Sequence, residues 1–136
     1  MKSIGTILST LLTDISTALP SLITAAGLDN FDTYAIGQSR NPKEKGLFIY
    51  KDNYRTSIDN ETLTMIIQAQ LAGIDEETSA DYEDVLLDYF KAYNPQRIGA
   101  TGLDSVDSDT WPIERSQGTF IFMYLSFSQD KDGCDD

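Results

Sequence analysis

The sequence predicts an α+β fold: a mainly antiparallel sheet of four to five strands with two main helices packed on one face. Two segments, near the N-terminus and around residues 75–94, repeat apolar residues at helical spacing, and the segments between and after them include runs of alternating apolar residues. The expected order is α-β-β-β-α-β-β. The 136 residues correspond to one domain, over residues 1–128, followed by an acidic disordered tail over 129–136.

The first element is an amphipathic helix that Ser3 can cap. Its apolar face consists of Ile4, Ile7, Leu8, Leu11, Leu12 and Ile15. Pro20 cannot continue a helix interior, so we expect a break there and a short second helix from Pro20 to Ala26, which Gly27 ends. Polar residues and Asp14 interrupt the apolar run, so we expect neither a signal peptide nor a membrane-spanning segment.

The next segments have the texture of strands. In residues 31–36, Phe31, Thr33 and Ala35 alternate with Asp32, Tyr34 and Ile36, as in a strand. Residues 41–46 are expected to form a polar turn. Residues 47–50 are a short run of side chains that favour strands. Asp52-Asn53 and Asp59-Asn60 are turn dipeptides. These dipeptides predict a long hairpin connection over residues 52–60, either without regular structure or with a short strand at residues 54–57.

Residues 61–72 fit both a strand and a helix. With period two, Leu63, Met65, Ile67, Ala69 and Leu71 share one face, and with period 3.6 a second apolar stripe is also acceptable. The strand is favoured because it gathers the threonines and glutamines on the other face, where only Ile66 is out of place.

The second helix is the clearest element. Acidic residues from Asp75 onward complement the positive end of its dipole, apolar residues then recur at i, i+3, i+4 and i+7, and Asn94-Pro95 ends it. Residues 97–103 are a weak strand candidate because of their glycines, and residues 104–118 predict a polar loop containing Trp111. The alternation of residues 119–128 predicts the last strand.

That last strand is apolar on both faces over its first half, which is typical of a strand covered on two sides or shared with a second subunit. We therefore expect an interface between subunits there and on the short strand near residue 48. The candidate interface residues are Leu47, Ile49, Phe120, Phe122, Tyr124 and Phe127.

Composition argues against most enzymatic and metal sites. The chain has no histidine, which excludes catalytic mechanisms that need one. It has a single cysteine, Cys134, so it cannot form an internal disulfide. The aspartates from Asp104 to Asp109 do not match an EF-hand calcium loop. Such a loop needs glycine at its sixth position and glutamate at its twelfth. In a loop that starts at Asp104, these positions are Asp109 and Arg115. We expect no catalytic residues, no cofactor and no metal.

The charge is strongly acidic and unevenly distributed. Residues 1–74 carry six basic and seven acidic residues, a net of −1, whereas residues 75–136 carry four and fifteen, a net of −11. Such a surface repels phosphate, so we expect no sequence-specific binding of nucleic acid.

The order of elements resembles the tail terminator proteins of long-tailed bacteriophages. The resemblance rests on residues 47–51, 61–72, 75–94 and 119–129, and it is one of pattern and length. It implies a non-enzymatic subunit that forms a homohexameric ring on the tail tube, stops tube growth and docks to the head. The implied partners are the tail tube protein and a head-completion protein, and the implied location is the cytoplasm during assembly and then the virion tail.

Physical size is compatible with that implication. A domain of this length has a radius of gyration of about 14 Å. Duplex DNA cannot pass through one such domain, so a conduit needs a ring closed by head-to-tail contacts. An acidic inner surface of the ring would let the phosphates of the DNA move past it without binding.

A different class also fits the pattern. Class I secretion chaperones are small acidic α+β proteins that act as dimers around an unfolded segment of another protein. They usually end in a further helix, whereas this chain ends in a predicted strand and an acidic tail. The resemblance to tail terminators gives no role to residues 104–109 or Trp111.

Overall fold

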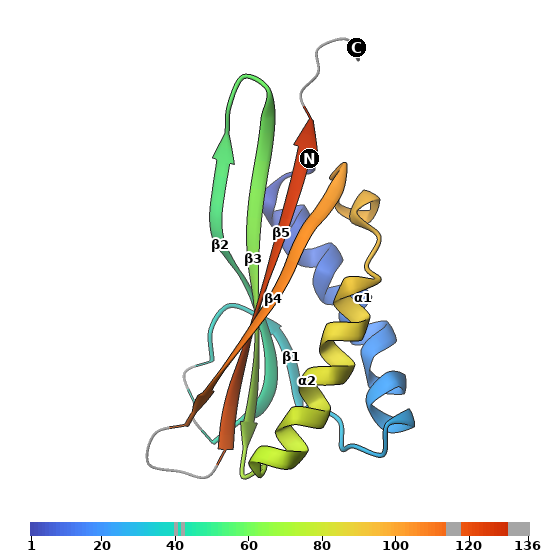
Figure 1. Ribbon diagram of the computed structural model, residues 1–136, viewed down its shortest axis with the longest axis vertical. Helices are drawn as coiled ribbons and strands as arrows, with labels where there is room; N and C mark the ends of the chain where they lie inside the picture. The colour runs from blue at the N-terminus through green and yellow to red at the C-terminus, as the bar shows by residue number, and fades with distance from the viewer. Residues whose placement is uncertain (40, 42, 114–117, 131–136) are drawn as a thin grey trace.

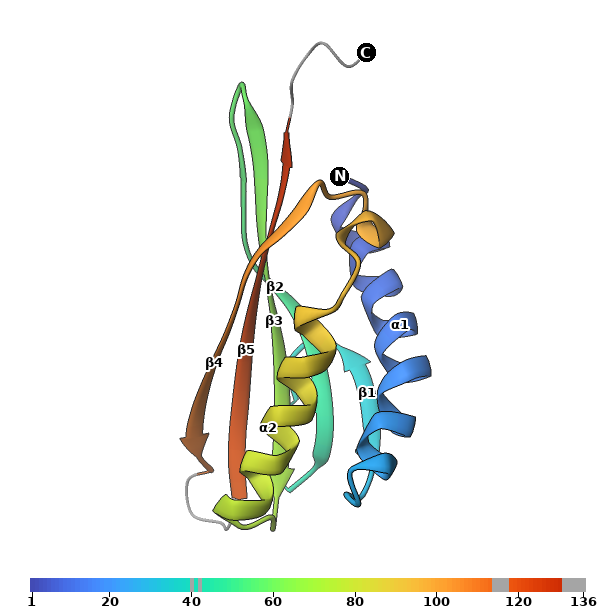
Figure 2. The same ribbon diagram turned by 45° about the vertical axis from the view of Figure 1, so that its right-hand side comes forward.

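The computed structural model describes residues 1–39, 41, 43–113 and 118–130. Its elements are α1 (Ile4–Ala25), β1 (Thr33–Ile36), β2 (Lys45–Thr56), β3 (Asn60–Ala72), α2 (Glu76–Lys91), the short 3-10 helix η1 (Pro95–Ile98), β4 (Gly102–Pro112) and β5 (Gly118–Asp130). The strands form one sheet in the order β1-β2-β3-β5-β4. The β1–β2 pair is parallel and the other three pairs are antiparallel. Both helices lie on one face of this sheet (Figures 1 and 2). The predicted α+β class and element order are confirmed.

Helix α1 begins where the sequence predicts. The Ser3 hydroxyl oxygen accepts a hydrogen bond from the Thr6 amide at 3.3 Å. One residue per turn is completely buried against the sheet: Ile7, Leu11, Ile15, Leu19 and Ile23.

The predicted break at Pro20 is wrong, because α1 is continuous through it. A proline inside a helix costs about 3 kcal/mol through a lost hydrogen bond and a steric clash. Leu19 and Ile23 are buried on either side of Pro20. Burying each such side chain contributes about 1.5–3 kcal/mol, which outweighs that cost.

By length and composition alone, α1 could cross a membrane, contrary to the expectation that no segment would meet this criterion. Core helices of soluble proteins and N-terminal signal sequences meet the same criterion. In this structure, the buried stripe of α1 belongs to the hydrophobic core that the helices and the sheet share.

The β2–β3 hairpin is longer than predicted. Its pairing runs from Lys45 opposite Leu71 to Thr56 opposite Glu61, with a bulge at Asp52. The expected connection over 52–60 is therefore mostly strand, because ladder pairing overrides the turn preference of Asp52-Asn53. We call residues 51–60 the arm; all of them are exposed. Figure 1 shows the arm extending beyond the helices.

Strand β3 is confirmed as a strand, and it lies at the centre of the sheet. Its predicted apolar face is completely buried: Leu63, Met65, Ile67, Ala69 and Leu71. The opposite face also contains buried residues, namely Ile66, Gln68 and Gln70.

The second helix follows its prediction closely. The Asp75 side chain caps α2 by accepting a hydrogen bond from the Thr78 amide at 2.7 Å, and this bond lowers the pKa of Asp75. Tyr82, Leu86 and Phe90 are buried beneath the helix.

The predictions for the C-terminal third need correction. Residues 104–112, expected as loop, lie in β4, and the expected strand at 97–103 is mostly η1 and a turn. Aspartate and serine disfavour strands, but β4 pairs with β5 along its length, and this long-range contact decides the structure. Strand β5 extends to Asp130, so Gln129 and Asp130 are not part of a tail. Residues 131–136, including Cys134, lie outside the described residues.

Candidate functional site

The face of the sheet away from the helices carries an unusual number of aromatic side chains. Successive side chains of a strand point to opposite faces. In β5, Ile121, Met123 and Leu125 are completely buried on the helix side, and Phe120, Phe122 and Tyr124 lie on the other side, partly exposed. Among the described residues, no helix covers this second side (Figure 2). We call it the open face.

The register extends this cluster across the sheet. Phe122 lies opposite Gln68 of β3, which in turn lies opposite Phe48 of β2. The apolar side chains of the open face together form the aromatic patch, which consists of Phe48, Tyr50, Ile66, Trp111, Phe120, Phe122 and Tyr124.

Exposure rises from the middle of this patch towards the β4 edge. Phe48 and Ile66 are only 4% and 8% exposed, whereas Trp111 is 56% exposed. The rings of Phe120 and Phe122 are 5.8 Å apart and tilted by 39°. The indole nitrogen of Trp111 donates a hydrogen bond to Asp109 at 3.1 Å. The edge of the patch is thus apolar but bordered by carboxylates.

The polar groups buried in this face are satisfied within the chain. Gln70 donates two hydrogen bonds, to the carbonyl oxygens of Asn41 at 2.5 Å and Glu44 at 2.8 Å. The Tyr50 hydroxyl donates to Gln68 at 3.0 Å, and burial raises the pKa of Tyr50. Asn41 and Glu44 of the β1–β2 connection therefore contact one end of the open face, and the buried side chains of Gln68 and Gln70 both have partners within the chain.

The six predicted interface residues divide between the two faces. Phe120, Phe122 and Tyr124 lie together on the open face. Leu47, Ile49 and Phe127 are completely buried in the core, so they cannot contribute to a contact surface of this folded chain.

Sequence reasoning missed four members of the patch: Phe48, Tyr50, Ile66 and Trp111. The alternation at residues 47–50 was visible, but it does not say which side meets the helices. Trp111 was missed because its segment was predicted as loop.

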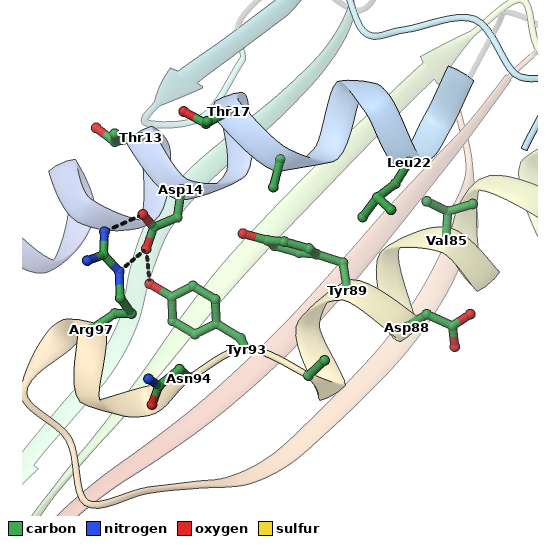
Figure 3. Close-up of a pocket in the computed structure, with 12 residues that line it drawn as sticks. Thr13, Asp14, Thr17, Leu22, Val85, Asp88, Tyr89, Tyr93, Asn94 and Arg97 are labelled. Atoms are coloured by element: carbon green, nitrogen blue, oxygen red, sulfur yellow. Dashed lines mark hydrogen bonds and ion pairs between the residues drawn. The ribbon is translucent and has the colours of Figure 1, made fainter. Parts of the chain in front are cut away.

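A second feature is a groove of about 890 Å³ between α1 and α2 (Figure 3). Leu22, Val85 and Tyr89 make part of it apolar, and Leu22 is 43% exposed. Its polar end contains Asp14 and Arg97.

Asp14 is the centre of a small hydrogen-bond network at this polar end. Arg97 donates to both carboxylate oxygens, from Nη2 at 2.6 Å and from Nε at 3.1 Å, and the Tyr93 hydroxyl donates at 2.7 Å. The Arg97 hydrogen bond is the main reason that the pKa of Asp14 is lowered, although partial burial opposes it. The network ties α1 to η1 and to the end of α2.

The tyrosines of the groove remain protonated at neutral pH. Burial, reinforced by the hydrogen bond to Asp14, raises the pKa of Tyr93, and burial raises the pKa of Tyr89 to about 12. Arg97 contacts both carboxylate oxygens of Asp14, and the Tyr93 hydroxyl contacts one of them. The arrangement is that of a structural tether.

Two aspartates of β4 form hydrogen bonds with side chains of the same sheet. Asp104 accepts a hydrogen bond from Ser128, and Asp109 accepts one from Trp111. No group of three or more candidate metal ligands occurs within the described part of the chain.

No family model matches the chain, and no curated protein matches its sequence.

Proposed function

We propose that the protein is a structural subunit that assembles with copies of itself into a ring, as the tail terminator proteins that it resembles do. In this role it would end a phage or prophage tail tube and join it to the head. The observation that carries the proposal is the aromatic patch on the open face.

Partly exposed aromatic clusters are characteristic of protein contacts. Aromatic side chains are enriched at interfaces, and Trp and Tyr are common among the residues that dominate binding energy. Phe120, Phe122, Tyr124 and Trp111 are contiguous across β5 and β4. A neighbouring subunit that covered them would remove apolar surface from water at about 25 cal/mol per Å².

The charge distribution supports the same role. Most of the net charge of −12 comes from residues 75–136, which include the exposed acidic side of α2. A ring lined by such surfaces would repel DNA phosphates and let the duplex pass without binding it.

The experiment is a measurement of mass in solution. Analytical ultracentrifugation over a wide concentration range should show a species of several copies, six if the resemblance holds in full. A compact monomer at every concentration would overturn the proposal.

A second candidate is a dimeric module that binds an apolar segment of another protein, like the secretion chaperones. The observation that favours it is the groove between α1 and α2, whose apolar part contains Leu22, Val85 and Tyr89. A stable two-fold dimer, with no larger species, would favour this candidate over the ring.

A further inference from the structure

The two edges of the sheet differ in charge. At one edge, β4 pairs with β5 alone among the described strands. At the other edge, the four-residue strand β1 covers β2 only as far as Ile49. From Lys51 to Arg55, no described strand pairs with the outer side of β2. Strand edges of this kind leave backbone hydrogen-bonding groups available to another strand.

The β4 edge is acidic. Asp104, Asp107 and Asp109 are all exposed, and β4 contains no lysine or arginine. Asp107 lies opposite Tyr124 and Asp109 lies opposite Phe122, so both aspartates are on the open face. Two β4 edges brought together would place these carboxylates near one another, which opposes pairing of β4 with itself.

The arm edge is the more basic of the two. It contains Lys51 and Arg55, with Asp52 at the bulge between them. Arg55 lies opposite Thr62, on the same side of the sheet as Ile66 and therefore on the open face. Neither Lys51 nor Arg55 forms an ion pair with a described residue.

We infer that the β4 edge of one copy pairs with the Lys51–Arg55 edge of the next copy, so that the sheet continues from subunit to subunit. This contact would place Arg55 on the same side as Asp107 and Asp109 of its neighbour, where an arginine and a carboxylate can form paired hydrogen bonds. Such a contact joins two different surfaces, and head-to-tail contacts of this type close into rings. The inference rests on the proposed function, since it takes the neighbour to be a second copy.

The test uses two charge reversals, Arg55→Asp and Asp107→Arg. Each variant alone should need at least about a tenfold higher concentration to assemble, corresponding to about 1.4 kcal/mol per contact. An equimolar mixture should assemble again, because the altered arm of one variant fits the altered β4 of the other, and the two unaltered edges also fit. Native mass spectrometry of differently tagged variants should show both in alternation.

The control is Asp84→Arg, which makes the same charge change as Asp107→Arg on the exposed side of α2. It should assemble like the unmodified protein, and circular dichroism should show that all three variants are folded. Normal assembly of Arg55→Asp, or a mixture of the two folded reversals that remains dissociated, would overturn the edge contact while the ring proposal stands. An unmodified protein that is monomeric at all concentrations would overturn both.

Discussion

The two faces of β5 are almost equally apolar over residues 120–125 but differ in their surroundings. On β5, the residues facing the helices are completely buried, and their neighbours Phe120, Phe122 and Tyr124 on the open face are partly exposed. The helix-covered face binds α1 and α2, which supply their own apolar stripes. The comparison shows that apolar content alone does not separate a core from a contact surface; the covering element does.

The largest expected effect comes from Phe127 on the covered face. Removing a buried phenylalanine costs about 3–5 kcal/mol, and a carboxylate in its place adds an unpaired buried charge. Since a domain is stable by about 5–15 kcal/mol, Phe127→Asp should unfold the protein. Far-UV circular dichroism and thermal melting would check this. A cooperative transition at the normal temperature would contradict the assignment of Phe127 to the core.

A smaller effect on stability, but a large one on assembly, is expected for Phe122 on the open face. Phe122→Asp should remain folded, because the new carboxylate can reach water, while assembly is lost. The matched control is Ser126→Asp, at a partly exposed position on the same face that lies opposite Thr64. If both Phe122→Asp and Phe127→Asp unfold, the open face is not a contact surface.

The smallest effect concerns the tether that holds the helix layer together. Asp14→Asn removes the charge that Arg97 and Tyr93 contact, so the free energy of unfolding should fall by about 1–3 kcal/mol near pH 7. The pKa of Asp14 is lowered by folding from its ordinary value of 3.8. Its contribution is therefore present above pH 3.8 and is lost as the pH falls through the lowered pKa.

Urea unfolding at several pH values would measure this contribution. The difference in the free energy of unfolding between the unmodified protein and Asp14→Asn should disappear in acid, because a protonated Asp14 carries no charge either. Asp88→Asn, in the same groove but outside the network, serves as the control and should leave stability unchanged. A gap that stays constant from neutral pH to well below 3.8 would show that the ion pair is not its source.

Local patterns were sufficient for the elements whose signals agree. The Asp75 cap, the apolar repeat through Phe90 and the Asn94-Pro95 stop all predict α2, and the structure has it there. For residues 61–72, the placement of the glutamines and threonines on one face correctly favoured a strand over a helix. The Asp14–Arg97 network had no sequence signal, since its partners are 83 residues apart.

The sequence by itself determined the fold class, the order of the elements and the acidic character, because spacing and composition act within a few residues of the chain. Only the tertiary structure decided that α1 continues through Pro20, that residues 104–112 are a strand, and which side of β5 is covered. Each of these depends on contacts between distant segments, and their energy exceeds the local preferences of proline and aspartate.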